Sequence, residues 1–486
     1  MIANLKPYPA MKDSGVPWLG EVPEHWTHLP GRACYREKKI PNTGMAEMTV
    51  LSLSYGQIVV KPTDKLHGLV PASFETYQIV EPGDIIIRPT DLQNDWNSLR
   101  FGLSRHRGII TSAYMCFHTE DVMTREYGHL VLHAYDLMKV FYGLGSGLRQ
   151  NLDWRDFKSL PCFVPPLGEQ AAIVRFLDRA DRRIRRYIRA KQKLIALLNE
   201  QKQAIIHCAV TRGLPSTGSG QADPNVRLKP SGVEWLGDVP EHWEVKRLKA
   251  LVTESVAGPY GSSLTKPMYT SAGYRVYGQQ QVIPDNFSIG DYYISEGKYQ
   301  EMRRYRVFPG DVLVSVMGTV GRVAVVPDSA EPGIINPRLV RYRPNLEKVR
   351  PRYLQLAMLS PTAQTQVSEG AKGTTMEGLN MQILGRLYLA IPSVDEQDAI
   401  LATVAAETTQ LQRAIDAANR SVSFLREYRT RMIADVVTGK LDVREAAARL
   451  PEEAEKPEPL DEADALSNVE EDTADERDAV PEEAEG

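Results

Sequence analysis

Two stretches of the chain place side chains at the seven-residue spacing of a coiled-coil helix. The first stretch has two interleaved, mostly apolar rows: Leu177, Ile184, Lys191, Leu198 and Ile205, with Ile188 and Ile195. The second stretch repeats the pattern: Val404, Leu411, Ala418, Leu425 and Met432, with Ile415, Val422 and Val436. This spacing predicts long helices at 167–212 and 394–440. About 40 residues at about 1.5 Å per residue make a rod of about 60 Å, so neither helix can bury its whole stripe on its own domain. We expect the two helices to pair in antiparallel orientation; two independent core helices are the alternative.

The sequence at the ends of the first helix supports these limits. Two prolines, Pro165 and Pro166, precede the helix, and Glu169 places a negative charge in its first turn. After Gly168 no glycine or proline occurs until Gly213. A stretch rich in glycine and serine follows, which predicts a flexible linker at 213–229.

Short β-rich runs separated by glycine turns precede each helix. They include Gln57–Val60, Asp84–Ile87 and Asp311–Val316. We therefore predict an α+β fold with two mixed domains at 1–166 and 230–393, each followed by one long helix. The two halves would be related by an approximate two-fold axis within one chain.

The two halves also repeat each other in sequence. Residues 14–26 and 231–243 are identical at eleven of thirteen positions, at an offset of 217. Three further segments repeat at an offset of 227: residues 81–87, the proline-to-Glu-Gln segment 165–170, and Val210-Thr211. This period is far too long for a solenoid, so it indicates duplication of a whole domain. Because the copies diverge between the repeated segments, one scaffold is expected to present two distinct surfaces.

Charge is distributed unevenly along the chain. The formal net charge is -4, but residues 452–485 carry 16 acidic side chains and only two basic ones, Lys456 and Arg477. That segment has few aromatic residues and predicts a disordered acidic tail at 441–486. Residues 1–450 then carry ten net positive charges, which favour a polyanionic partner, although only weakly.

The sequence predicts a cytoplasmic protein. No apolar run approaches the roughly 18 residues that span a bilayer, and the first residues lack the apolar stretch of a signal peptide. All four cysteines lie in the first half and none belongs to a CxxC pair: Cys34, Cys116, Cys162 and Cys208. We expect free, buried thiols and neither disulfides nor a zinc site.

Motifs of catalysis are missing from the sequence. There is no GxxxxGK[ST] loop for a nucleoside triphosphate and no Asn-Pro-Pro-aromatic motif of an amino-methyltransferase. The glycines of 143–147 are expected to shape a loop. His129 and His133 lie four residues apart and could share a metal, but without an accompanying Glu they are interpreted as structural. The repeated Glu-His-Trp, at 24–26 and 241–243, could perform acid–base chemistry; we interpret it as an aromatic packing clasp. No catalytic, cofactor-binding or metal-binding residue is predicted.

The repeated motifs together resemble a known family. Trp-Leu-Gly-x-Val-Pro-x-His-Trp opens each domain, and a proline-ended segment runs through Glu-Gln into each long helix. Glycine-rich stretches, Gly145–Leu152 and Gly370–Leu379, lie upstream of the helices. Over residues 11–441 this arrangement is similar to the specificity subunit of a Type I restriction-modification system. The acidic tail is not part of the pattern.

The resemblance implies two target recognition domains, each reading one half of a split, asymmetric DNA sequence, with the helices as a spacer. It also implies two adenine-methyltransferase subunits and a motor-endonuclease subunit as partners. Those partners would carry the S-adenosylmethionine, ATP and magnesium chemistry. This chain would select the site on double-stranded DNA and catalyse nothing.

Candidate DNA contacts are arginines, glutamines and one lysine in the divergent parts of the two domains, since such side chains read base edges. In the first domain they are Arg88, Arg100, Arg105, Arg107, Arg149 and Gln150; in the second they are Gln279, Gln280, Gln281, Arg303, Arg304, Arg322 and Lys372. A second group on the helices could serve partner subunits or DNA phosphate: Arg182, Arg183, Arg185, Arg186, Arg426, Arg429 and Arg431.

Three other functions stay open at this level. The same scaffold could serve a restriction architecture in which one partner both methylates and cleaves. A duplicated coiled-coil adaptor that binds proteins would need no DNA affinity. A nuclease would need clustered carboxylates, and Glu81, Asp84 and Asp311 are too sparse to support one.

Overall fold

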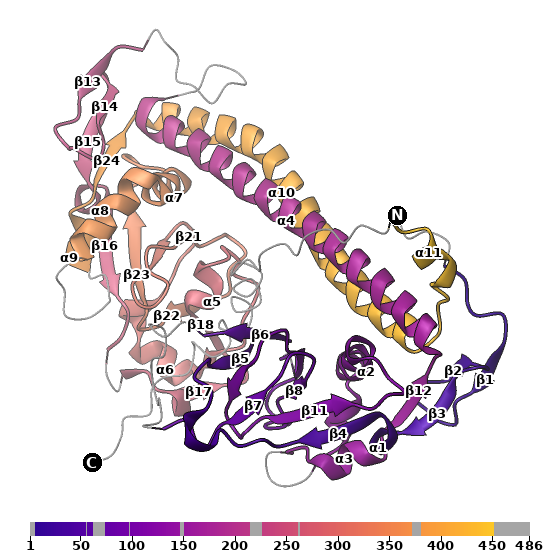
Figure 1. The fold of residues 1–486 in the computed structure, drawn as a ribbon. Helices are drawn as coiled ribbons and strands as arrows, with labels where there is room; N and C mark the ends of the chain where they lie inside the picture. The colour runs from indigo at the N-terminus through magenta and orange to yellow at the C-terminus, as the bar shows by residue number, and fades with distance from the viewer. Residues whose placement is uncertain are drawn as a thin grey trace. The chain divides into compact units, whose positions relative to one another are not determined.

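The computed structural model describes residues 5–54, 56–61, 73–96, 98–145, 150–213, 226–260, 263–371 and 381–451. The chain forms two compact units (Figure 1). The first combines Met1–Arg189 with Val422–Gly486, and the second is Ala190–Ser421. Each long helix therefore contributes residues to both units.

The first unit is built around an antiparallel four-stranded sheet. Its order is β4 (Tyr35–Lys38), β11 (Met115–Thr119), β8 (Ile85–Ile87) and β9 (Phe101–Leu103). The helix α2 (Arg125–Leu137) packs against β9 and β11. Four two-stranded pairs surround this sheet: β1 (Met11–Asp13) with β2 (Glu21–Pro23), β3 (Thr27–Pro30) with β12 (Pro161–Val164), β5 (Leu51–Ser54) with β6 (Gln57–Val60), and β7 (Gln78–Val80) with β10 (Gly108–Ile110). The short helices are α1 (Gly31–Cys34), η1 (Thr43–Met45), η3 (Val140–Gly143) and α3 (Trp154–Lys158).

The second unit repeats this framework. Its main sheet has the order β16 (Val252–Ala257), β23 (Leu339–Pro344), β20 (Val312–Ser315) and β21 (Val323–Val325), with α7 (Pro351–Leu359) against it. Two outer pairs correspond to those of the first unit: β13 (Leu228–Pro230) with β14 (Asp238–Pro240), and β15 (Glu244–Arg247) with β24 (Tyr388–Ile391). The remaining short helices are η4 (Leu248–Ala250), α8 (Pro361–Ala371) and α9 (Met381–Gly385).

An additional sheet distinguishes the second unit. It has the order β17 (Tyr269–Thr270), β19 (Tyr293–Ile294), β18 (Tyr274–Tyr277) and β22 (Gly333–Ile335), and β18 pairs with β22 in parallel. The helices α5 (Gln279–Val282), α6 (Glu296–Glu301), η6 (Lys266–Met268) and η7 (Arg303–Tyr305) belong to the same part of the chain. In the corresponding part of the chain the first unit has the pairs β5–β6 and β7–β10, so the two copies differ in structure between their repeated segments.

The central strands follow from their sequence. All three residues of β8 and all four of β20 are buried, and all of them except Ser315 are apolar, so neither strand alternates apolar and polar side chains. A Pro-Gly-Asp turn precedes each strand, and its aspartate accepts a hydrogen bond from the backbone three residues earlier. Glu81 N donates to Asp84 Oδ2 at 2.7 Å, and Phe308 N donates to Asp311 Oδ2 at 2.9 Å. The repeated motif is therefore a structural turn, and its carboxylates are engaged within it.

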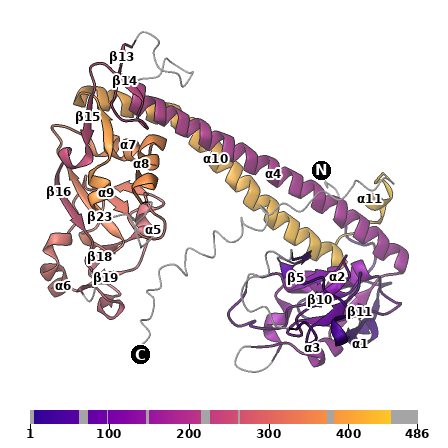
Figure 2. The same ribbon diagram turned by 60° about the vertical axis from the view of Figure 1, so that its left-hand side comes forward.

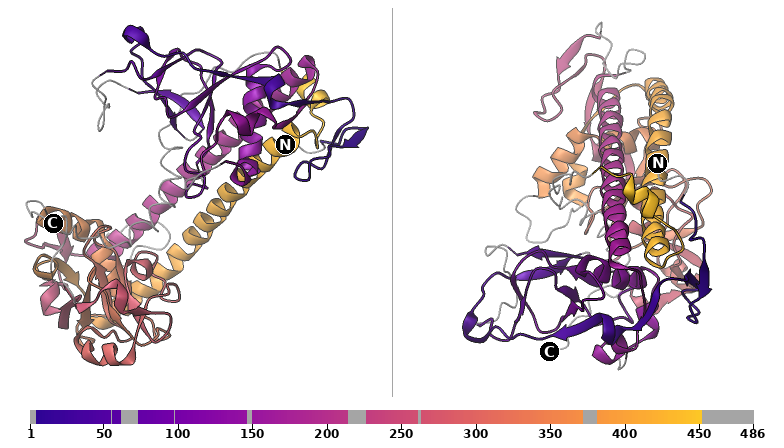
Figure 3. Two further views of the ribbon diagram at one scale, coloured as in Figure 1. Left: turned by 90° about the horizontal axis from the view of Figure 1, so that it is seen from below. Right: turned by 45° about the vertical axis from the view of Figure 1, so that its right-hand side comes forward.

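The two long helices, α4 (Leu167–Arg212) and α10 (Val394–Val437), lie side by side (Figures 2 and 3). In the first unit, Ile184 and Ile188 of α4 share a core with Val422 and Val436 of α10. In the second unit, the opposite ends meet: Ile206 belongs to the same core as Val404, and Lys202 Nζ donates to Gln412 Oε1 at 2.8 Å. Within each unit the start of one helix thus packs near the end of the other, as antiparallel pairing requires.

The chain after the second helix differs from its prediction. The segment 441–451 is folded, since α11 (Arg444–Ala448) places Val443 and Ala447 in the core of the first unit. Asp442 N also donates to Lys6 O at 2.8 Å. The predicted tail therefore begins too early, because its first residues carry apolar side chains that the first unit buries. Residues 452–486 lie outside the described part, as do the linker residues 214–225, and β13 begins at Leu228 within the predicted linker.

The four cysteines are free thiols, and the predicted burial holds for three of them. Cys34, Cys116 and Cys162 are buried, and Cys208 is partly exposed. Within the described ranges, no helix combines the length and apolar character needed to cross a membrane.

Replacing Ile184 with alanine tests the packing of the helix pair. Ile184 is 5% exposed within the core of the first unit, so Ile184→Ala should lower the free energy of unfolding by about 2–5 kcal/mol. Leu197 on the same helix is 53% exposed, so Leu197→Ala should change it by less than about 0.5 kcal/mol. Chemical denaturation of both variants gives the comparison. Equal destabilisation would contradict the assignment of the buried face.

Candidate nucleic-acid interface

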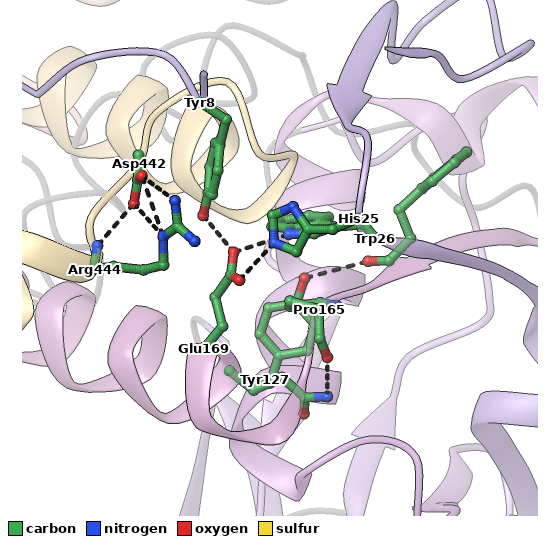
Figure 4. A network of polar contacts seen from close by, with 10 residues as sticks. Tyr8, His25, Trp26, Tyr127, Pro165, Glu169, Asp442 and Arg444 are labelled. Atoms are coloured by element: carbon green, nitrogen blue, oxygen red, sulfur yellow. Dashed lines mark hydrogen bonds and ion pairs between the residues drawn. The ribbon is translucent and has the colours of Figure 1, made fainter. Parts of the chain in front are cut away.

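A carboxylate in the first turn of α4 gathers the repeated aromatic segment of the first unit (Figure 4). Glu169 Oε1 accepts hydrogen bonds from Tyr8 Oη at 2.6 Å and from Trp26 Nε1 at 2.9 Å. His25 Nε2 lies 2.8 Å from Glu169 Oε2. Trp26 is 1% exposed, so its indole N–H has no access to bulk water and needs this partner. Glu169 therefore fixes the start of the helix to the opening segment of the domain.

The second unit contains the same arrangement. Trp243 Nε1 donates to Glu396 Oε1 at 2.9 Å, and His242 Nε2 lies 3.0 Å from Glu396 Oε2. Trp243 is fully buried. The predicted packing clasp is therefore confirmed in both copies, and we name the Trp–His–Glu group the clasp. The sequence analysis missed that the clasp closes on the helix glutamate. The signal was present, because His-Trp and Glu-Gln both recur in the two halves.

The glutamine after each clasp glutamate ties the helix to a different part of its domain. Gln170 Oε1 accepts from Thr124 N at 2.8 Å, and its amide donates to the carbonyl of Val122 at 2.9 Å. Gln397 Oε1 accepts from Arg350 N at 2.8 Å, and its amide donates to Lys348 O at 2.9 Å. These bonds satisfy backbone groups just before α2 and α7. The Glu-Gln pair thus positions the whole domain on its helix.

The end of the other long helix reaches the same tryptophan. In the first unit, Gly439 follows α10 with φ 78°, and a Cβ there would lie 2.3 Å from Pro23 and 3.1 Å from Trp26. In the second unit, Gly213 follows α4 with φ 93° and faces Trp243. The left-handed backbone favours glycine at both positions. Each clasp tryptophan therefore bonds the glutamate in the first turn of one long helix and lies near the glycine that follows the other.

The clasp of the first unit has an outer layer from the two ends of the chain. The guanidinium of Arg444 lies 4.9 Å from the ring centre of Tyr8, and its Nη2 is 2.6 Å from Asp442 Oδ2. Burial and the hydrogen bond to Glu169 raise the pKa of Tyr8. Glu169 is also the more buried of the two clasp carboxylates, with a side chain 6% exposed against 25% for Glu396.

Away from the clasp, each main sheet carries a loop between its last two strands. In the first unit it is the β8–β9 loop, residues 88–100. Arg100 is fully buried, and its guanidinium donates to the carbonyls of Thr90 at 2.7 Å, Asp91 at 3.2 Å and Asp95 at 2.6 Å. Asp91 has a left-handed φ of 64°. The interpretation of Arg100 as a DNA contact is therefore wrong, because its donors are consumed in holding this loop.

Polar and aromatic side chains form the exposed face of the β8–β9 loop. Gln93 and Asn94 are exposed, and Trp96 is 53% exposed while its ring stacks on Tyr142 with centroids 4.6 Å apart. Asn94 Nδ2 donates to Asp91 Oδ1 at 2.9 Å. Arg88, a predicted contact, is partly exposed and pairs with Asp95 at 3.2 Å.

The glycine-rich stretch supports this loop from outside. Leu152 N donates to Pro89 O at 2.8 Å, and Asp91 N donates to Asn151 Oδ1 at 3.1 Å. The candidate Gln150 is half-buried with φ 48°. Arg149 lies outside the described residues.

The second unit has the corresponding β20–β21 loop, residues 316–322. Gln279 is 7% exposed, and its amide donates to the carbonyls of Met317 and Thr319. Ser315 Oγ donates to Thr319 O at 2.6 Å and accepts from Arg322 N at 3.0 Å. Met317 is 38% exposed and Arg322 is exposed. The exposed candidate Arg322 thus lies at the end of this loop.

Burial also excludes two predicted glutamine contacts. Gln279 supports the loop, and Gln281 is 2% exposed, with its side chain accepting from Gly278 N and donating to Ile289 O. Both are positioning residues, because their amides are satisfied internally. Gln280, between them, is exposed.

The other candidates lie away from these loops. Arg105 and Arg107 are exposed, and Arg107 faces Glu47 at 3.4 Å and Glu81 at 3.6 Å. Arg303 and Arg304 are exposed on η7, and Lys372 lies outside the described residues. On the helices, Arg182 pairs with Asp178, while Arg185 and Arg429 both pair with Asp181.

The two neighbouring histidines of α2 lie with their rings parallel, 5.8 Å apart. Burial lowers the pKa of His133 to about 3, and the neighbouring His129, Arg429 and Arg185 add to this effect. Burial also lowers the pKa of His129 to about 4. Among the described residues, no three His, Cys, Asp or Glu side chains gather as a metal site.

Removing the two clasp glutamates separately tests their roles. Glu169→Ala leaves the buried Trp26 and Tyr8 donors without a partner, so it should weaken the first unit by about 3 kcal/mol. Glu396→Ala should weaken the second unit by about 1–2 kcal/mol, since fewer donors depend on it. Hydrogen–deuterium exchange of β3 and β15 reports the two units separately. Glu24→Ala, at an exposed position, is the control. If either variant increased exchange equally in β3 and β15, the proposal that each glutamate stabilises only its own unit would be contradicted.

His133 makes the first unit sensitive to acid. The folded unit keeps His133 neutral down to about pH 3, whereas the unfolded chain takes up a proton near pH 6.5. From His133, stability should therefore fall by about 1.4 kcal/mol per pH unit between those values, and His129 adds to the loss because burial lowers its pKa to about 4. Asp136, whose burial raises its pKa to about 6, partly offsets the loss because the folded state binds its proton first. Denaturation at several pH values should show a shallower slope in His133→Leu. The control His106→Leu, at an exposed site, should keep the full slope.

The chain is similar in sequence to a family model and to two known proteins. Residues 240–416 match the model of the Type I restriction modification DNA specificity domain. The chain is 21% identical over 374 residues to the Type I restriction enzyme MjaVIII specificity subunit of Methanocaldococcus jannaschii, covering 74% of this chain and 81% of the relative. It is 22% identical over 287 residues to the EcoBI specificity subunit of Escherichia coli, covering 59% of each chain.

A solved structure shares the fold. It comes from work on complex assembly and conformational transition of the type I R-M system, and it superposes with a TM-score of 0.61 at 15% identity, covering 86% of this chain and 99% of that one. The resemblance identified from the sequence is therefore confirmed: residues 240–416 match the Type I restriction modification DNA specificity domain, and the chain is similar to the specificity subunits of Type I restriction-modification systems.

Proposed function

We propose that this chain is the DNA-recognition subunit of a Type I restriction-modification system. The observation that carries the proposal is the duplicated clasp, which holds two domains in the same way while their exposed loops differ. Two domains that share the same clasp but differ in their exposed loops are suited to recognise two different DNA sequences. The match of residues 240–416 to a DNA specificity domain supports the same conclusion.

The proposed target is bipartite and asymmetric. Each domain would read one half-site at base edges, while phosphate contacts fix its register on the duplex. Two modules on a rigid spacer read half-sites about one helical turn apart, about 34–36 Å, or a multiple of it. The paired helices α4 and α10 would provide that spacer, with the two domains related by an approximate two-fold axis.

The chemistry would belong to partner subunits. We propose two adenine-methyltransferase subunits and one motor-endonuclease subunit, which bring S-adenosylmethionine, ATP and Mg²⁺. This chain would direct them to the target in the cytoplasm without catalysing a step itself. The arginine-rich outer surfaces of α4 and α10 offer polar sites for such partners.

Methylation mapping tests the proposal. Host cells that carry this chain with its cognate methyltransferase should methylate adenine on both strands of one split motif, and cells without the chain should not. Binding of the purified chain to duplexes containing that motif should also weaken steeply between 50 and 200 mM salt, because each neutralised phosphate releases counterions.

Other outcomes would identify the rival functions. Chain-dependent methylation and cleavage by a single partner polypeptide would indicate the alternative restriction architecture. A stable complex with active methyltransferase but no chain-dependent methylation, together with salt-insensitive partner binding, would favour a protein-binding adaptor.

A further inference from the structure

We propose that the β8–β9 loop and the β20–β21 loop are the sequence-reading elements of the two domains. Gln93 and Asn94 would contact base edges of the first half-site, and Met317 and Arg322 those of the second. This inference rests on the proposed function and specifies which residues carry it. None of these four residues except Arg322 is a candidate from the sequence alone.

The position of the loops in the duplicated frame is the first argument. Both loops connect the last two strands of the main sheet, and both follow the repeated Pro-Gly-Asp turn and its buried strand. The strands before them correspond at an offset of 227, yet the loops differ in length, with 13 residues in one and seven in the other. The two copies are therefore alike in the packed strands and differ in the loops that follow them.

The second argument is that buried polar side chains hold both loops in shape. Arg100 bonds four loop carbonyls in the first unit, and Gln279 bonds two in the second. Left-handed backbone at Asp91, and at Gly318 with φ 64°, fixes the sharp bends. A buried guanidinium is a costly way to stabilise a loop that only connects two strands. A preorganised loop instead loses less conformational entropy when it binds, which favours a recognition role.

The third argument is the chemistry of the exposed side chains. Glutamine and asparagine can pair with both hydrogen-bonding atoms at the major-groove edge of adenine, and arginine can do so with guanine. An apolar side chain such as Met317 can contact the thymine methyl group. Asp95, which would repel DNA phosphate, is turned to Arg88 at 3.2 Å and to Ser98 N at 2.9 Å. Trp96 supports the exposed face by stacking on Tyr142.

Two double variants test the inference, because each should lose discrimination at particular base pairs of the DNA target. The full-length chain, alone and together with its cognate methyltransferase, selects duplexes from a randomised pool, and the bound duplexes are sequenced. Gln93→Ala/Asn94→Ala should reduce discrimination by about 5- to 150-fold at one or two base pairs of one half-site only. Met317→Ala/Arg322→Ala should do the same in the other half-site. All four side chains lie on exposed loop positions, so folding should be unaffected.

Matched controls separate base reading from general affinity. Arg105→Ala/Arg107→Ala, exposed in the first domain but off the loop, should weaken all duplexes alike and keep the motif. Gln201→Ala/Gln203→Ala, exposed on α4, should leave selection unchanged.

Each result decides between the two proposals. If the unmodified chain selects a split motif and the loop variants retain full discrimination, or lose it equally in both halves, the loop inference is overturned. If the unmodified chain selects no motif, the proposed function fails and the loop inference falls with it.

Discussion

The hydrogen bond from a buried tryptophan to a glutamate in the first turn of a long helix determines how each unit is built. The indole N–H of Trp26 and of Trp243 donates over 2.9 Å in both units. An unpaired buried N–H would cost about 1–3 kcal/mol, so the glutamate must lie where the tryptophan points. Its negative charge also suits the positive end of the helix dipole. The same ring faces the glycine that ends the other long helix, so its position constrains the domain and both helices together.

Because of the clasp, the residues that stabilise each domain are different from the exposed loop residues that vary between the two copies. The clasp glutamates anchor each domain at the helix start, while the β8–β9 and β20–β21 loops connect strands of the main sheets and differ between the two units. Within the loops, the same division recurs on a smaller scale, because Arg100 and Gln279 face inward and Gln93 and Arg322 face outward. A substitution at an outward position therefore leaves the inward network intact. This arrangement permits the exposed surface to differ between the two copies without loss of the fold.

Features that appear as a periodic or repeated sequence pattern can be predicted, whereas features that depend on tertiary contacts cannot. The heptad rows predict α4 and α10 because periodic burial on a helix is visible in one dimension, and Ile85–Ile87 predicts a central strand for the same reason. Repetition reveals the clasp, since His-Trp and Glu-Gln occur twice. Arg100, Gln279 and Gln281 are misread because an arginine or glutamine that bonds buried carbonyls has the same sequence signature as one that binds DNA. Likewise α11 is hidden, because its few apolar residues precede a strongly acidic segment, and their burial in the core of the first unit is visible only in the folded chain.

The asymmetry between the two clasps extends this argument to the ends of the chain. The first clasp includes Tyr8 and the layer of Asp442 and Arg444, whereas among the described residues, which omit 214–225, the side chains that bond the second clasp glutamate are His242 and Trp243. The first unit joins two segments that are far apart in the sequence, Met1–Arg189 and Val422–Gly486. The second unit is one continuous segment, Ala190–Ser421, so it loses less chain entropy when it closes. The duplicated domains therefore keep one anchoring geometry on two chain connectivities, one discontinuous and one continuous.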